Sequence, residues 1–157
     1  WNAEELVRAC GLTAWRFDHL LSDQQPFRPF HQVETLSPFV DLSRGFAAYE
    51  EDRCRAGSRE IARIRANVRA AQRQVGPLRF EFHTSDGRVF ETLVRWKSEQ
   101  YRGTGCTNVF ALPWVLRLLE RIRRQQGAMF AGVLSALYIG DRLTAVHLGM
   151  RSGDVLH

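Results

Sequence analysis

The chain lacks any long apolar run. Its hydrophobic stretches stay far below the roughly 20 consecutive residues that a membrane-spanning helix needs. The first residues also lack the basic and then apolar pattern of a secretory signal. We therefore expect a cytoplasmic segment without a membrane span.

Cysteine is scarce and never paired in a C-x-x-C motif. The three residues are odd in number and far apart: Cys10, Cys54 and Cys106. This pattern argues against a disulfide framework and against a zinc site. His19, His31 and His83 show no metal-ligand spacing, so we expect no metal. The sequence also has no serine nucleophile elbow and no Walker loop, which excludes those two chemistries.

Lysine is almost absent, since Lys97 is the only one beside 21 Arg residues. The formal net charge is +5, which raises the possibility of RNA binding. However, the Arg residues are spread along the chain among 17 acidic residues. Mixed charges are typical of a solvated surface rather than a nucleic-acid-binding tail. Nucleic acid is therefore disfavoured as a partner, although a few Arg residues can serve a small anionic ligand.

The two ends also lack the features of native termini. The chain starts at Trp1 rather than Met, and His157 falls within the strand-like run 154–157. We therefore expect a domain that is cut from a longer protein.

The first half predicts a few separate elements. Asn2 is a suitable cap for a helix over 3–10, and alternation predicts strands over 15–21 and 39–42. The stretch 24–38 holds three Pro residues and predicts a connection. A helical stretch starts at Ser43, and its strongest part is 59–75, where one apolar stripe lies apart from the Arg residues.

The second half predicts a β-meander preceded by a strand and two helices. Alternation indicates a strand over 78–84, followed by a turn at Asp86-Gly87. A helix over 89–102 that ends at Gly103 is favoured over a returning strand, and a second helix runs from Pro113 to a stop at Gly127. Strands over 130–139 and 143–150, and a third from Val155, complete the pattern. The sequence thus predicts a mixed α/β (α+β) fold, in which the Arg-bearing helices cover a mainly antiparallel sheet.

One glycine pattern has two interpretations. Residues 100–105 have the spacing Gln-x-x-Gly-x-Gly, which in acyl-coenzyme A transferases forms a loop of N–H groups around a pyrophosphate. The chemistry needs a helix directly after the loop, whereas here a helix precedes it. A helix that ends at Gly103 explains the pattern without any ligand and is the favoured interpretation.

A polar and aromatic cluster near the same helix end is the candidate binding site. Its cations suit phosphate or carboxylate, and its aromatic rings suit a pocket wall. An ordinary helix terminus is the alternative. The members of the cluster are Trp96, Lys97, Gln100, Tyr101 and Arg102.

His147 is the candidate general base. It lies on the predicted strand 143–150, on one face with Ala145 and Gly149, whose small size leaves room for a ligand. A core histidine with a satisfied hydrogen bond is the alternative.

Residues 78–157 resemble the GNAT-like acetyltransferase domain of cellulose-biosynthesis-associated (CelD-like) proteins, which are akin to FemAB aminoacyl transferases. The resemblance rests on the runs 78–82, 96–101, 132–137, 140–142 and 145–149. It implies tandem lobes, with 1–25 as the tail of a first GNAT-like lobe and 26–157 as the N-terminal and central part of a second. The GNAT-like fold would then be incomplete at both ends.

The same resemblance implies a function. An acyl group would pass from acetyl-coenzyme A or another acyl-coenzyme A to an amine or hydroxyl of a small molecule, glycan or peptide precursor. A base would take the acceptor's proton, while N–H groups polarise the thioester carbonyl. In such folds the donor binds a central strand and the helix after it, whereas this chain stops where that strand begins. We therefore expect the segment alone to be inactive. A non-catalytic scaffold lobe and an RNA-binding module are the alternatives.

Overall fold

The computed structural model describes residues 2–16, 20 and 22–157. The chain divides into two compact units, Trp1–Asp52 and Arg53–His157, and each is described by itself. This division falls within the second helix of the chain. The tandem-lobe boundary after residue 25 stays a prediction.

In its described residues the first unit contains one capped α-helix, one 3₁₀ helix and the first part of the α-helix Phe46–Arg55. Helix α1, Ala3–Ala9, confirms the predicted helix, and Asn2 forms a reciprocal capping box with Glu5. The Asn2 side chain accepts from the Glu5 N–H at 2.8 Å, and the Asn2 N–H donates to the Glu5 carboxylate at 3.0 Å. The predicted connection contains the 3₁₀ helix η1, Gln25–Phe30, whose Phe27 is buried against Trp15.

The strands predicted in this unit differ from the structure. Residues 17–19 and 21 of the predicted strand 15–21 lie outside the described residues, and Trp15, Arg16 and Leu20 have no regular secondary structure. The prediction of a strand over 39–42 is wrong, because this segment has no strand partner among the described residues. An alternating pattern specifies which side chains share a face, but a strand also needs a neighbour for its backbone hydrogen bonds.

Helices α2 and α3 follow. Helix α2, Phe46–Arg55, and helix α3, Glu60–Gln74, are separated by Gly57 in a left-handed conformation. The Arg residues of α3 are exposed, as predicted. Its apolar stripe is poorly covered, since the Ile64 side chain is 55% exposed. Helix α3 makes no substantial contact with the sheet in the described part of the chain, so the prediction that the Arg-bearing helices cover the sheet is wrong for α3.

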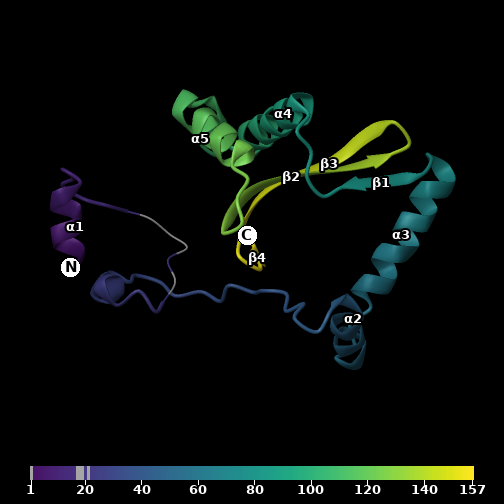
Figure 1. The fold of residues 1–157 in the computed structure, drawn as a ribbon, viewed down its shortest axis with the longest axis horizontal. Coiled ribbons are helices and arrows are strands. Elements are labelled where there is room, and N and C mark those ends of the chain that lie inside the picture. Colours follow the sequence, from purple (N-terminus) through teal and green to yellow (C-terminus); the bar gives the residue numbers. More distant parts are fainter. Residues whose placement is uncertain (1, 17–19, 21) are drawn as a thin grey trace. The chain divides into compact units, whose positions relative to one another are not determined.

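The four strands form one antiparallel sheet in the order β1-β2-β3-β4 (Figure 1). Strand β1 is Leu78–Glu81, β2 is Phe130–Ile139, β3 is Arg142–Ser152 and β4 is Val155–Leu156. The predicted meander is confirmed, with Gly140 and Gly153 at positive φ in its two turns. The mixed α/β fold with a mainly antiparallel sheet is therefore as predicted.

Helices α4 and α5 connect β1 to β2 and lie on the same side of the sheet (Figure 1). Helix α4, Gly87–Thr104, confirms the favoured helix over the returning strand, and Asp86 caps its first turn by accepting from the Arg88 N–H at 2.9 Å. The predicted end at Gly103 is wrong, because Gly105 is the left-handed cap, with φ 69°. After the short 3₁₀ helix η2, Val109–Ala111, helix α5 runs over Pro113–Arg124. It ends two residues before the predicted Gln126.

Strand β2 is the centre of the core. Residues 131–136 are all buried, and Leu134 is fully inaccessible to solvent. Leu134 and Ala136 pack with Val89 of α4, and Val146 and Leu148 of β3 pack against this cluster. On the opposite face the Ser135 hydroxyl donates to the Phe82 carbonyl at 2.7 Å. The Leu134 N–H donates to His83 Nδ1 at 3.3 Å, so a side chain continues the pairing beyond the end of β1.

Gly132 is the point at which α5 meets the sheet. A Cβ atom there would overlap the carbonyl oxygen of Ile122 and would lie 2.9 Å from the Arg123 Cα. The Gly132 N–H donates to the Gln125 carbonyl at 2.9 Å, and the Gln126 side chain donates to the Gly132 carbonyl at 2.8 Å. The end of α5 is therefore hydrogen-bonded to β2 at a distance that only glycine allows.

We expect Gly132→Ala to lower the free energy of unfolding by about 2 kcal/mol or more, because the helix end must move away from β2. The matched control is Gly103→Ala within α4, where an added Cβ has no atom within 4 Å. The control should raise stability by about 0.5–1 kcal/mol through helix propensity. Urea unfolding followed by circular dichroism measures both changes, and equal effects of the two variants would contradict the close contact.

Candidate functional site

His147 lies on the sheet face opposite α4 and α5. It pairs with Ser135 across β2 and β3, whereas its neighbours Val146 and Leu148 pack against the helix-side core. The imidazole is exposed and lies over Gly149, where an added Cβ would be 2.7 Å from the His147 Cε1 atom. The space that we predicted for a ligand beside Gly149 is therefore filled by the imidazole itself. The alternative of a buried core histidine is wrong, since the side chain is exposed.

Aromatic rings share this face of the sheet with His147. Phe80 is opposite Leu137 in the β1–β2 register, and its side chain is 58% exposed. Phe82, whose carbonyl accepts from Ser135, is 54% exposed. His147 thus lies on a sheet face that carries exposed apolar side chains, where an acceptor group could approach an imidazole from solvent.

The predicted binding cluster divides into two parts on α4. Lys97 Nζ donates to Gln100 Oε1 at 3.1 Å, and both side chains are exposed. Arg102 instead folds back along the helix, where its Nε donates to the Ser98 carbonyl at 3.2 Å. At 100° per residue, Arg102 lies well away from Lys97 around the helix axis.

The two aromatic members are half-buried. Trp96 is partly covered, and the Tyr101 ring packs against Phe110 with 5.8 Å between the ring centroids. Neither cavity described below is lined by any of the five predicted residues. The structure thus brings Lys97 and Gln100 together and directs Arg102 elsewhere.

The glycine pattern at 100–105 is a helix end. Residues 100–104 belong to α4, and Gly105 and Cys106 donate their N–H groups to carbonyls of the last turn. A helix C-terminus presents carbonyl oxygens and the negative end of the helix dipole, which repel a pyrophosphate. The helix-end interpretation is therefore confirmed, and the phosphate-loop interpretation is wrong.

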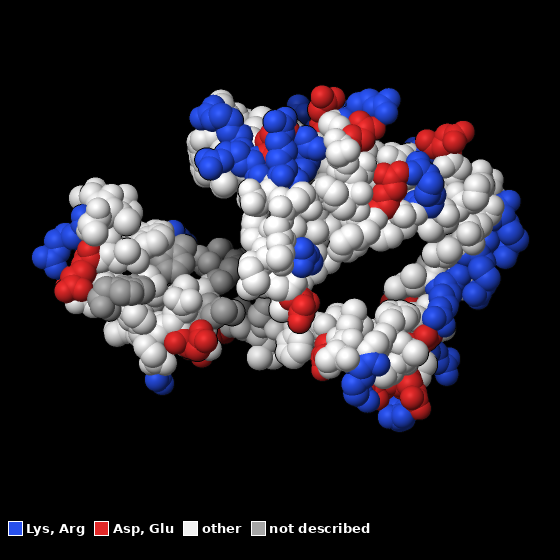
Figure 2. Space-filling view, in the orientation of Figure 1, with Lys and Arg blue, Asp and Glu red and all other residues white. Residues whose placement is uncertain are grey.

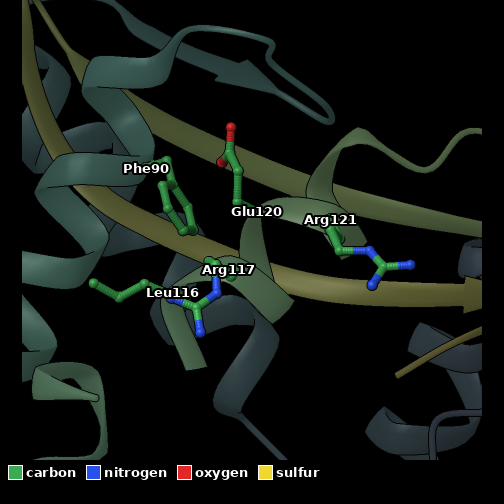
Figure 3. Close-up of a pocket in the computed structure, with 5 residues that line it drawn as sticks. All are labelled: Phe90, Leu116, Arg117, Glu120 and Arg121. Atoms are coloured by element: carbon green, nitrogen blue, oxygen red, sulfur yellow. The ribbon is translucent and has the colours of Figure 1, made fainter. Parts of the chain in front are cut away.

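A cavity between α4 and α5 was not predicted from the sequence. It has a volume of about 470 Å³ and opens broadly to solvent (Figure 3). One α4 residue and four α5 residues line it: Phe90, Leu116, Arg117, Glu120 and Arg121. Arg117 and Arg121, four residues apart on a helix, were the available sequence signal, because such a pair shares one face.

Glu120 is held by two arginines beside this cavity. Arg123 donates to both carboxylate oxygens, at 2.6 and 2.8 Å, and Arg124 donates to one of them at 2.7 Å. The Arg123 side chain is only 10% exposed, lies over the Phe90 ring and donates to the Ser85 carbonyl at 3.1 Å. The hydrogen bonds from Arg123, followed by those from Arg124, lower the pKa of Glu120 against the opposing effect of burial.

A second, smaller cavity of about 310 Å³ lies at the start of α4. It is lined partly by Asp86 and Arg88, which form an ion pair, and by Tyr138. The hydrogen bonds from Arg88 lower the pKa of Asp86. The Arg79 guanidinium covers the Tyr138 ring at 4.0 Å from its centroid. Asp86 and Arg88 are already paired with one another, and the remaining charged residue of the lining is the acidic Asp141.

Residues 58–157, which contain all of these features, match the family model for an acetyltransferase (GNAT) domain. The chain belongs to the GNAT acetyltransferase family. No curated protein and no solved structure matches the chain at a significant level. GNAT domains generally use acyl-coenzyme A donors, so family membership supports acyl transfer in general. The matched range starts just before α3 and contains the whole sheet.

The GNAT domain carries no evident metal centre in its described residues. Within 2–16, 20 and 22–157, no three His, Cys, Asp or Glu side chains are placed to hold an ion. Across the same residues, none of the helices combines the length and the apolar character needed to cross a bilayer.

The Glu120 network predicts a pH effect on the stability of the GNAT domain. The pKa of Glu120 is lower in the folded state than in the unfolded state, so its ionised carboxylate stabilises the fold. This contribution to the free energy of unfolding is present above the unfolded pKa of about 4.3, and it is lost as the pH falls through the lowered folded-state pKa. We expect Glu120→Gln to lower the free energy of unfolding by about 1 kcal/mol at pH 7. The variant should also lose less stability than the wild type on acidification.

Glu99→Gln is the control, since Glu99 is exposed on α4 and has no ion pair among the described residues. Urea unfolding at several values between pH 7 and pH 3 makes the comparison. If the free energy of unfolding changes with pH in the same way in the wild type and in Glu120→Gln, the Arg123 and Arg124 contacts contribute nothing to this pH dependence.

Proposed function

We propose that this chain is part of an acyl-coenzyme A-dependent N- or O-acyltransferase that acts on a polysaccharide or cell-envelope precursor. The observation that carries acyl transfer is the family match over 58–157, together with a sheet and two helices that have the predicted order. The precursor class is supported only by the resemblance of 78–157 to CelD-like and FemAB-like proteins.

The proposed reaction is direct transfer. The acceptor nitrogen or oxygen attacks the thioester carbonyl carbon, the carbon–sulfur bond breaks, and coenzyme A leaves as the thiolate. The acceptor's proton passes to a base, for which we propose His147. Its exposure to solvent supports this role.

The predicted binding cluster on α4 (the α4 cluster) is proposed to bind substrate and to take no part in the chemical step. Lys97 and Gln100, joined by a hydrogen bond, present a cation and an amide to solvent, which suits a phosphate or carboxylate. Trp96 and Tyr101 would supply apolar contact, and Arg102 would need to leave the Ser98 carbonyl to join them. A small-molecule, glycan or peptide acceptor fits these groups equally well.

Calorimetric titration of the intact protein with acetyl-coenzyme A tests the donor. We expect saturable heat release and a rise in the melting temperature, because a ligand that binds only the folded state stabilises it. Free coenzyme A should bind too, whereas adenosine should bind far more weakly. No heat and no thermal shift at millimolar donor would favour the non-catalytic scaffold.

His147→Ala tests the base. We expect kcat to fall by about 10²–10⁴-fold while acetyl-coenzyme A binding is retained, because only proton transfer is lost. Arg142→Gln, an exposed position on the same strand, is the control and should keep its activity. A His147→Ala enzyme with an unchanged pH–rate profile would remove His147 from the mechanism.

A further inference from the structure

Two cations beside the α4–α5 cavity have no counter-charge. Arg117 and Arg121 are exposed and form no ion pair or hydrogen bond among the described residues. The nearest acid on their own helix, Glu120, already accepts from Arg123 and Arg124. Figure 2 shows the positive side chains that gather over α5 as a result. The cavity wall therefore carries two positive charges that nothing in the described chain neutralises.

The spacing of these two cations is unfavourable unless an anion joins them. Residues four apart on a helix lie on the same face, and like charges at this spacing repel one another. In Figure 3 the two guanidinium groups point in different directions. Both side chains are free to turn toward a common ligand, since neither is held by a hydrogen bond.

The rest of the cavity is apolar. Phe90 contributes its ring from α4, and Leu116 contributes its side chain from α5 (Figure 3). The Phe90 ring is fixed in place because it packs against the core cluster and lies under Arg123. A rigid aromatic wall beside two mobile cations suits a ligand with an apolar part and an anionic group.

We propose that the cavity formed by Phe90, Leu116, Arg117 and Arg121 binds a phosphate monoester whose organic part is apolar or aromatic. Two guanidinium groups match the charge of about −1.5 to −2 on a phosphate monoester at pH 7, whereas a carboxylate neutralises only one of them. RNA is less suitable, because affinity for a nucleic-acid backbone needs several phosphate contacts in a row. The proposal does not depend on acyl transfer.

The test uses phenyl phosphate, inorganic phosphate and benzoate as probes in NMR or calorimetric titrations of the intact protein. We expect phenyl phosphate to bind more tightly than inorganic phosphate, because of the apolar wall, and more tightly than benzoate, because of its charge. Arg117→Gln/Arg121→Gln should weaken phenyl phosphate binding by about tenfold or more. Equal affinity for all three probes would overturn the proposal.

The matched control is Arg69→Gln/Arg73→Gln on α3. These two arginines are also exposed and four residues apart, and they form no ion pair or side-chain hydrogen bond among the described residues. The variant therefore removes the same charge at the same spacing. The control should bind phenyl phosphate as the wild type does. If both double variants lose affinity for phenyl phosphate equally, general electrostatic attraction explains the binding and the proposed site does not exist. The same conclusion follows if an RNA oligonucleotide is added as a fourth probe and both variants lose affinity for it alone.

Discussion

The contact between the end of α5 and strand β2 at Gly132 determines how the rest of the domain is arranged. The helix backbone approaches the strand so closely that a side chain has no room. The Gly132 N–H donates to the Gln125 carbonyl, and the Gln126 side chain donates to the Gly132 carbonyl. Because α5 follows α4 after a short connection, this contact also places α4 over Leu134 and Ala136. The face that carries Leu134 and Ala136 is therefore covered by helices. Ala131, Val133 and Ser135, which alternate toward the other face of the same strand, are buried as well.

The two faces of the sheet consequently have different chemistry. The helix side forms the core, with Val89 of α4 against β2 and β3. The opposite side exposes Phe80 and His147, and the absence of a side chain at Gly149 lets the imidazole lie flat on the strand. The candidate base is thus on the face where a substrate can approach, away from the packing that stabilises the fold.

One carboxylate on α5 determines which arginines of this helix are held in ion pairs and which are not. Glu120 accepts from Arg123 and Arg124, and Arg123 also covers Phe90 and binds the Ser85 carbonyl. Glu120 thus accepts its hydrogen bonds from Arg123 and Arg124, and accepts none from Arg117 or Arg121. The same arginine-rich helix therefore supplies both a stabilising network and two free cations, which is why total Arg content says little about which Arg residues can bind a ligand.

The sequence by itself determined the elements whose signals are local. The Asn2 cap, the glycine turns at 140 and 153, and the strands over 130–139 and 143–150 each depend on neighbouring residues, and all of them are confirmed. The sequence also placed the α4 cluster, but whether its five side chains converge depends on their rotamers and partners. Only the tertiary structure decided that residues 39–42 lack a strand partner and that Arg117 and Arg121 form no ion pair among the described residues. Those outcomes depend on contacts between residues far apart in the chain or on competition for one acceptor, which a local pattern does not contain.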